Sequence, residues 1–402
     1  MITADDVRRA CTQIRDSVFV SRCALSDPFS QLTDTQLFLK YENLQMTGSY
    51  KERGALNKIL NLTPEEVGRG LIAASAGNHA QAVSYHATKR GIPAQICMPL
   101  PTPLNKVMST RRFGAEVVLH GANYDEACDE ARRRSAELGL TFIHPFDDDA
   151  VIAGQGTIGL ELLEQVPGLE AVVTSVGGGG LIAGLACVLK ESNPRIRVIG
   201  VQTARLASMK AALAESRPVT LPVSYTLADG IAVRRAGDRT FPMVQKYVDE
   251  IVTVEEEEIA NAILLLLERE KTLVEGAGAA AVAALVYHKA ACAGKRVAAI
   301  ISGGNLDVSI LSRIIERGLV KDGRLIRLRI HLPDYPGALH RLTGVLAHHR
   351  ANIVETSYDR AYFGVNIGDT AIDLTMETRG AEHVEELLLA LTAENYVFER
   401  IQ

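Results

Sequence analysis

The chain has 402 residues, of which 47% are hydrophobic and 23% are charged. This length exceeds what one hydrophobic core serves, so we expect two or three domains. A net charge of −5 gives no support for nucleic-acid binding. The longest apolar stretches, such as 277–286, are too short to cross a bilayer.

The N-terminus and the cysteines indicate where the protein works. The first ten residues carry early acids and no apolar run after their arginines, so they do not read as a secretory signal. The six cysteines are scattered singly and show no metal-ligand spacing. We therefore expect reduced thiols in a cytoplasmic protein, with no metal site and no contact with membranes.

The first 320 residues alternate short apolar runs with helical periodicity. Predicted strands lie at 71–74, 93–98, 116–120, 141–145, 171–176, 197–201 and 296–301, and predicted helices include 78–90 and 124–139. Continuous Val, Ile and Ala runs between amphipathic helices are typical of a parallel sheet covered on both faces. Residues 1–320 are thus predicted to form an α/β, doubly wound parallel-sheet body in two lobes.

The pattern changes after residue 320. Residues 325–332 alternate with a period of two, and 333–350 contain a turn and an amphipathic helix. Two further strands, 352–361 and 369–378, precede a helix at 382–394. This order predicts a separate ferredoxin-like βαββαβ domain at 321–402.

A run of four glycines in SVGGGGLIAG, residues 175–184, follows a predicted strand and opens a helix. Such a loop lets backbone N–H groups approach an anion, and the helix N-terminus adds partial positive charge. The segment matches neither the P-loop nor the G-x-G-x-x-G fingerprint. It therefore predicts a phosphate site for a ligand smaller than a dinucleotide.

Two more loops, SAGNHA at 75–80 and SGGN at 302–305, also follow predicted strands. Ligands bind at the carboxyl ends of parallel strands, so the three loops predict one pocket. The small residues of 75–80 leave N–H groups free for a carboxylate, and Asn78 can both donate and accept. We interpret His79 as a structural hydrogen-bonding residue rather than as a base.

Lys51 stands among small and hydroxyl-bearing residues in TGSYKERGA, residues 47–55. Lysine can form an imine with an aldehyde cofactor, and a crowded ammonium loses its proton readily. Together with the loops, it predicts a pocket that holds a phosphate, a small carboxylate and an imine.

TGSYKERGA, SAGNHAQ, SVGGGGLIAG and SGGN, in this order, resemble the fold type II pyridoxal-phosphate enzymes. More narrowly, they resemble the threonine dehydratase (threonine ammonia-lyase) family, which includes serine dehydratases and serine racemases. The resemblance covers about residues 15–320. PDYPGAL (333–339) and NIVETSYDR (352–360) resemble the ACT domain, an amino-acid-sensing module. The whole chain is similar to the single-ACT form of threonine dehydratase.

The resemblance implies a role for each loop. Lys51 would be the Schiff-base lysine, Asn78 would contact the ring hydroxyl of pyridoxal phosphate, and Ser302 would meet its pyridine nitrogen. The phosphate would be held by Gly177, Gly178, Gly179, Gly180 and Leu181, and the substrate carboxylate by Ser75, Ala76, Gly77, Asn78 and His79. An amino-acid effector, isoleucine or valine, would bind at Asp334, Pro336, Gly337, Ala338, Leu339 and Asn352.

The implied reaction is β-elimination, from L-threonine to 2-oxobutanoate and from L-serine to pyruvate. A neutral Ser302 hydroxyl leaves the ring unprotonated, which favours prompt elimination over transamination. Serine racemases carry a second Ser where this chain has Ala76, so we expect elimination from one face. Gln202 and Ser208 depart from the residues that bind a divalent cation in some relatives. Glu275 has two interpretations that are about equally favoured. It is an acid near the cofactor, or it is a carboxylate at the start of a helix.

Other functions stay open. The chain could be a serine dehydratase, another 3-hydroxy amino acid ammonia-lyase, or a racemase. A β-replacing transferase fits less well, because LADGIAV (227–233) and the ACT-like tail argue against it. A non-catalytic amino-acid sensor would require a silent Lys51. The resemblance also implies a homodimer or homotetramer that acts in amino-acid metabolism, as in isoleucine biosynthesis.

Overall fold

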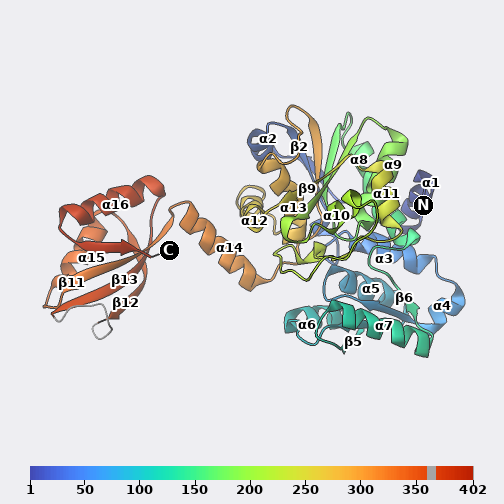
Figure 1. Cartoon of the computed structure of the whole chain (residues 1–402), viewed down its shortest axis with the longest axis horizontal. Coiled ribbons are helices and arrows are strands. Elements are labelled where there is room, and N and C mark those ends of the chain that lie inside the picture. The colour runs from blue at the N-terminus through green and yellow to red at the C-terminus, as the bar shows by residue number, and fades with distance from the viewer. Residues whose placement is uncertain (360–367, 402) are drawn as a thin grey trace. The chain divides into compact units, whose positions relative to one another are not determined.

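The computed structural model describes residues 1–359 and 368–401, which form two compact units (Figure 1). Unit 1 is Met1–Leu306 and unit 2 is Asp307–Gln402. Among the described residues, no helix has both the length and the apolar character that a membrane crossing requires.

The larger sheet of unit 1 has six strands. Their order is β1 (Cys23–Leu25), β2 (Gln36–Tyr41), β10 (Arg296–Ile301), β7 (Ala171–Ser175), β8 (Arg197–Thr203) and β9 (Glu250–Val254). Every pair is parallel except β1–β2. One face packs on α1 (Ala4–Ile14), α8 (Asp149–Gln165), α9 (Gly180–Ser192) and α11 (Thr240–Tyr247). Helix α13 (Gly276–Val286) packs along β7, β8, β9 and β10 on the other face.

The smaller sheet has four parallel strands in the order β5 (Glu116–Leu119), β4 (Ala94–Met98), β3 (Leu71–Ala74) and β6 (Thr141–Phe142). Its two faces follow from the sequence of β3. Leu71 and Ala73 pack with α5 (Asn78–Thr88), whereas Ile72 and Ala74 pack with α7 (Tyr124–Leu138). Because both faces are covered, β3 is apolar at every position.

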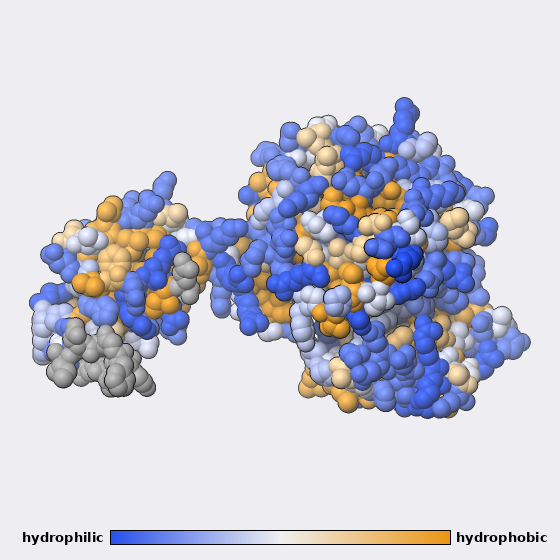
Figure 2. Space-filling model, in the orientation of Figure 1, coloured by the Kyte–Doolittle hydropathy of each residue, from blue (hydrophilic) through white to orange (hydrophobic). Residues whose placement is uncertain are grey.

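The other helices of unit 1 complete its two lobes. They are α2 (Asp27–Thr33), α3 (Lys51–Leu60), α4 (Pro64–Arg69), α6 (Leu104–Arg112), α10 (Ser208–Ala214) and α12 (Glu256–Glu270), with short 3₁₀ helices at Glu42–Leu44, Ala204–Leu206 and Asp229–Ile231. Hydrophilic residues cover most of the visible surface of this unit (Figure 2). The two parallel sheets confirm the predicted two-lobed, doubly wound body.

One predicted strand of the body is shorter than the sequence suggested. Strand β6 ends at Phe142, whereas the apolar run predicted a strand over 141–145. The chain turns because the ring Nδ1 of His144 accepts the backbone N–H of Asp147 at 2.8 Å. The residues that follow leave the sheet, and the carbonyl of Pro145 meets the Nζ of Lys51.

Unit 2 begins with helix α14 (Val308–Lys321) and continues as a βαββαβ fold. The elements are β11 (Leu325–Pro333), α15 (Ala338–His348), β12 (Asn352–Asp359), β13 (Asp369–Glu377), α16 (Ala381–Ala393) and β14 (Val397–Arg400). The antiparallel sheet has the order β12-β13-β11-β14. Alternate residues of β11 (Ile326, Leu328, Ile330) face the core beneath the two helices. This confirms the predicted ferredoxin-like domain; residues 360 and 361 of the predicted strand lie outside the described residues.

A buried cluster of four charges joins β2, α3 and α8. Arg53 donates to both carboxylate oxygens of Glu42 at 2.8 Å and to Glu161 at 2.6 Å. Lys40 also donates to Glu161, and both cations are almost fully buried. Burial alone would raise the pKa of Glu42, but Arg53 and Lys40 hold it below its ordinary value. Two cations thus balance two anions, and the first turn of α3 is held in place.

Replacing Arg53 with Met should destabilise the protein strongly. The change leaves the carboxylates of Glu42 and Glu161 buried without their main partner, which costs about 3–5 kcal/mol. Chemical denaturation measures the free energy of unfolding. The same change at exposed Arg195 should cost less than about 0.5 kcal/mol. Equal unfolding free energies for the two variants would contradict this role of the cluster.

Candidate active site

Lys51 is the first residue of α3, and its side chain lines a cavity that it shares with the glycine loop. Its Nζ donates to the carbonyl oxygen of Pro145 at 2.9 Å. Burial lowers the pKa of Lys51 to about 8, although the charge of Glu275 opposes the shift. The neutral, nucleophilic fraction of this amine is therefore much larger near neutral pH than that of an exposed lysine.

The tetraglycine loop, 177–180, leaves β7, opens α9 and lines the same cavity. Gly179 has a φ of +101°, a conformation that favours glycine. A Cβ on Gly178 would overlap the ring of Phe146, so a bare backbone is required there. The first N–H groups of α9 have no carbonyl partner within the helix. These residues fit a phosphate group.

Asn78 opens α5 and has both ends of its amide fixed. Its Oδ1 accepts from Asn305 at 2.7 Å, and its Nδ2 donates to Glu275 at 2.6 Å. The second hydrogen of Nδ2 is then the group that can meet a ligand, and it fits an acceptor such as a ring oxygen. Burial, and then the charge of Asp229, raises the pKa of Glu275 to about 7. Glu275 is the N-cap of α13, but it makes no side-chain capping bond and pairs with Asn78 instead.

Ser302 follows β10 directly and is buried beside the start of α3. Its Oγ lies 3.3 Å from the Oγ of Ser175, and its carbonyl accepts the N–H of Tyr50 at 3.1 Å. This hydroxyl fits a pyridine nitrogen that needs a neutral partner.

The loop 75–79 shows backbone N–H groups at the start of α5. The Oγ of Ser75 accepts the N–H of Gly77 at 3.2 Å. The ring of His79 is buried, with Nε2 2.9 Å from the carbonyl of Ile143, and burial lowers its pKa to about 3. A neutral imidazole in this position is a structural hydrogen-bonding group. Only the backbone of His79 then fits a substrate carboxylate.

Gln202 and Ser208 use their side chains in hydrogen bonds to the backbone. Gln202 donates to the carbonyl of Val176 at 3.2 Å and accepts the N–H of Lys210 at 2.9 Å. Ser208 donates to the carbonyl of Val233 at 2.6 Å. Both side chains therefore support segments that line the cavity. No cluster of three metal-ligating side chains occurs in the described part of the chain.

The structure separates the residues that the sequence suggested for an effector. Residues 334–339 follow the end of β11, and Gly337 is the N-cap of α15, with a φ of +92°. Asn352 starts β12, and the register places it at the opposite end of the sheet, because Glu377 pairs with both Asn352 and Leu325. The two ends of β11 are about 25 Å apart. The predicted effector residues do not meet within one chain.

Comparison with known proteins agrees with this geometry. Residues 14–303 match the protein family described as pyridoxal-phosphate dependent enzyme. The chain belongs to this family. The matched region ends at Gly303, so it contains Lys51, the glycine loop and Ser302. As a member of this family, the enzyme depends on pyridoxal phosphate.

Individual relatives narrow the comparison. The chain is 49% identical to an L-threonine ammonia-lyase of Thermotoga maritima over 396 residues, 98% of each protein. It is 42% identical to a catabolic L-threonine dehydratase of Escherichia coli K12, over 78% of this chain and 96% of that one. The first relative thus matches both units.

Solved structures show the same fold with different reactions. The processed threonine deaminase isoform 2 of Solanum lycopersicum has a TM-score of 0.73 and 37% identity, over 78% of this chain and 93% of its own. A maize serine racemase has a TM-score of 0.74 and 33% identity, over 79% and 98%. The fold alone therefore does not select the reaction, and the residues of the site must do so.

The structure also reveals site residues that sequence reasoning did not name. Asn305 is the last residue of the SGGN loop, in which only Ser302 was assigned a role. Pro145 and Phe146 meet Lys51 and the glycine loop from the segment after β6. Their roles depend on the early end of β6, which the apolar run at 141–145 conceals.

The reactivity of Lys51 should follow its lowered pKa. In cofactor-free protein, an amine-reactive reagent should modify Lys51 half-maximally at about pH 8, because only the neutral amine reacts and burial disfavours the ammonium. Mass spectrometry of the digested protein gives this pH profile, with exposed lysines as the internal reference. A midpoint near that of an ordinary lysine, about 10.4, would contradict the assignment.

Proposed function

We propose that this protein is a pyridoxal-phosphate-dependent lyase that converts L-threonine to 2-oxobutanoate and ammonia, and L-serine to pyruvate. The observation that carries the proposal is the lowered pKa of Lys51 opposite a glycine cradle in one cavity. A relative that matches nearly the whole chain is named L-threonine ammonia-lyase, and this supports L-threonine as the substrate.

The residues present fit the cofactor at each of its polar groups. The N–H groups of 177–181 would hold the phosphate, the Nδ2 of Asn78 the ring oxygen, and the hydroxyl of Ser302 the ring nitrogen. Bound pyridoxal phosphate supplies an electron sink for the bonds at the substrate Cα. A hydroxyl at the ring nitrogen keeps this sink weak, so loss of the β-hydroxyl is favoured over transamination.

Lys51 acts as the base in this proposal. Its neutral amine takes the Cα proton, and its contact with the carbonyl of Pro145 holds the Nζ at the cavity wall. The N–H groups of 75–79 bind the substrate carboxylate and thereby fix which face of Cα meets Lys51. Ala76 has no proton to return from the other face. We therefore assign elimination from one face, rather than racemisation, despite the structural likeness to a serine racemase.

The competing functions make different demands on the site. A β-replacing transferase needs a second nucleophile, and a non-catalytic sensor needs an unreactive Lys51. The lowered pKa of Lys51 argues against the sensor. A serine-specific or other 3-hydroxy amino acid ammonia-lyase uses the same residues, so product analysis must separate it from the proposed function.

We extend the proposal to regulation and assembly. Unit 2 has the predicted βαββαβ order, and the loop 334–339 ends in the exposed N-terminus of α15. We propose that an amino acid such as isoleucine or valine binds at this loop in a homodimer or homotetramer. Asn352 of a neighbouring copy can then complete the site that one chain leaves divided. Six free cysteines support a cytoplasmic enzyme, which would serve isoleucine biosynthesis.

Release of 2-oxo acids from L-threonine and L-serine tests the function. Replacing Lys51 with Ala should lower kcat/KM by at least about 10³-fold, because base and imine-forming amine are lost together. Lys58 lies on the same helix, about two turns after Lys51, and pairs with Asp148. Its replacement with Ala is the control and should stay within about threefold.

The reaction mixtures of this assay also test the one-face assignment and the effector. Residual serine should stay in the L form, and added isoleucine or valine should change the rate of 2-oxo acid release. Near-normal turnover by the Lys51→Ala variant would refute the function. Appreciable D-serine would refute the one-face assignment.

A further inference from the structure

Two polar contacts hold one residue, Thr47, from opposite sides. Its backbone N–H donates to the Oε1 of Glu52, and its carbonyl accepts from the Nδ2 of Asn305 at 2.8 Å. Thr47 and Glu52 are buried, and Thr47 precedes Lys51 by four residues. The backbone that leads into Lys51 is therefore fixed at this point.

Both contacts continue to helix α5. On one side, the Oε2 of Glu52 lies 3.4 Å from the Nε2 of His86, and both side chains are fully buried. On the other side, the Nδ2 of Asn305 also donates to the Oδ1 of Asn78 at 2.7 Å. Asn78 and His86 lie on α5, eight residues or about 12 Å apart. The contacts thus form a closed ring through Thr47 and α5.

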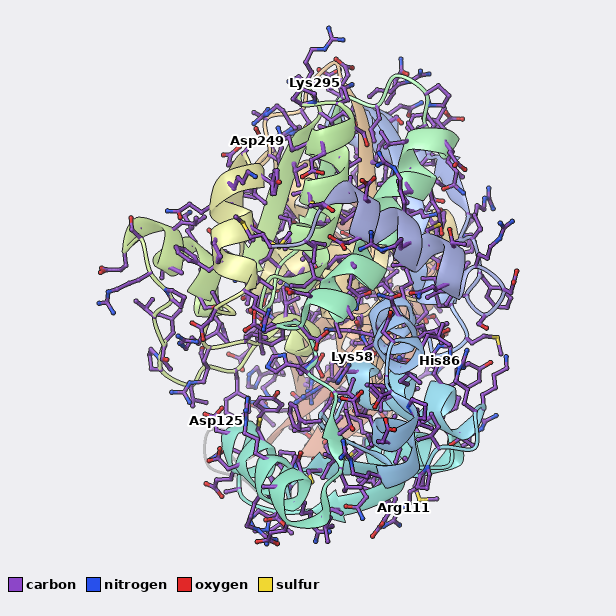
Figure 3. All side chains as sticks on the ribbon, turned by 90° about the vertical axis from the view of Figure 1, so that its right-hand side faces the viewer. Lys58, His86, Arg111, Asp125, Asp249 and Lys295 are labelled. Carbon is purple, nitrogen blue, oxygen red and sulfur yellow. The ribbon has the colours of Figure 1, made fainter. Side chains whose placement is uncertain are left out.

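Glu52 and His86 are fully buried between helices, so neither side chain acts at the protein surface. Figure 3 labels Lys58 on α3 and His86 on α5, and these helices pack against each other. Burial lowers the pKa of His86, so its ring is neutral in this interface. A buried carboxylate and a buried imidazole are costly unless each finds a polar partner. The Oε2 of Glu52 and the Nε2 of His86 make no hydrogen bond to another described residue, so their 3.4 Å contact is what each has there, and the reaction as proposed uses neither.

We propose that Glu52 and Asn305 are positioning residues, which clamp Thr47 and thereby set Lys51 and Asn78 relative to each other. The inference rests on the proposed function, in which Lys51 is the base and Asn78 contacts the cofactor. Lys51 lies on the backbone that the clamp fixes, and Asn78 lies on the helix to which it is tied. Loosening the clamp should therefore separate the base from the ring that receives the substrate electrons, a displacement to which catalysis is sensitive.

The clamp is tested with two changes at Glu52. Replacing Glu52 with Leu should speed hydrogen exchange at the Thr47 amide and lower kcat/KM for threonine, each by at least about tenfold, because the buried hydrogen bond to the Thr47 N–H is lost. Replacing Glu52 with Gln should restore both to within about threefold, because its amide oxygen still accepts and its NH₂ can donate to His86. If Gln and Leu are equally harmful, Glu52 is not a positioning residue.

A double variant tests whether the two arms act through Thr47. Asn305→Asp removes the donor with little change of shape, and it should also lower kcat/KM by about tenfold. Because both arms hold the same residue, Glu52→Leu with Asn305→Asp should lose less than the product of the single losses. Losses that multiply fully would overturn the proposal. Asn61→Asp, at the exposed end of α3, is the matched control and should stay within about threefold.

Hydrogen exchange separates this inference from the proposed function. It reports the clamp directly, whether or not the protein releases a 2-oxo acid. If the wild-type protein fails to act on threonine but Thr47 shows the expected exchange pattern, the proposed function fails and the clamp stands. If threonine is consumed but exchange at the Thr47 amide does not change when Glu52 is replaced, the clamp is wrong and the proposed function stands.

Discussion

The buried ion cluster around Arg53 is the constraint on which the geometry of unit 1 depends. Arg53 lies two residues after Lys51, so the two side chains leave the first turn of α3 on nearly opposite sides. One side is fixed by Glu42, in the 3₁₀ helix that follows β2, and by Glu161 of α8. The other side presents an amine to the cavity. A charged group buried this deeply tolerates few alternative arrangements, so it specifies the orientation of the helix as well as holding it.

The rest of the site is assembled by strand ends. β3, β7 and β10 each stop at a short loop of small residues. The first loop opens α5, the second lines one cavity with Lys51, and in the third Gly303 pairs with Ser49 just before α3. Parallel strands bring their carboxyl ends to one edge, so loops that lie far apart in the sequence meet there. The chemistry follows from what each loop offers: bare N–H groups at 177–180, a hydroxyl at Ser302 and an amide at Asn78. Lys51 supplies the single strongly basic group among them.

Much of this arrangement could be predicted from the sequence, because its signals are local. The glycine run, the small-residue loops and Lys51 each reveal a backbone requirement or a reactive group, and buried strands such as 71–74 are apolar at every position. Strands β1, β2 and β9 were missed, since they are short or carry polar residues; β2 contains Lys40, whose partner Glu161 lies 121 positions away. The early end of β6 depends on one ring nitrogen of His144. The ring through Thr47 joins three segments that lie far apart in the sequence, so it leaves no local pattern.

The central claim is that Lys51 is the residue that carries the cofactor opposite the glycine cradle. Borohydride reduction of the purified holoenzyme, followed by digestion and mass spectrometry, tests it most directly. Reduction makes the link between lysine and cofactor permanent, so the modified peptide identifies the lysine. The account predicts one pyridoxyl group, on the peptide that contains Lys51. Modification of a different lysine, or a Lys51 peptide that stays unmodified in cofactor-loaded protein, would contradict it.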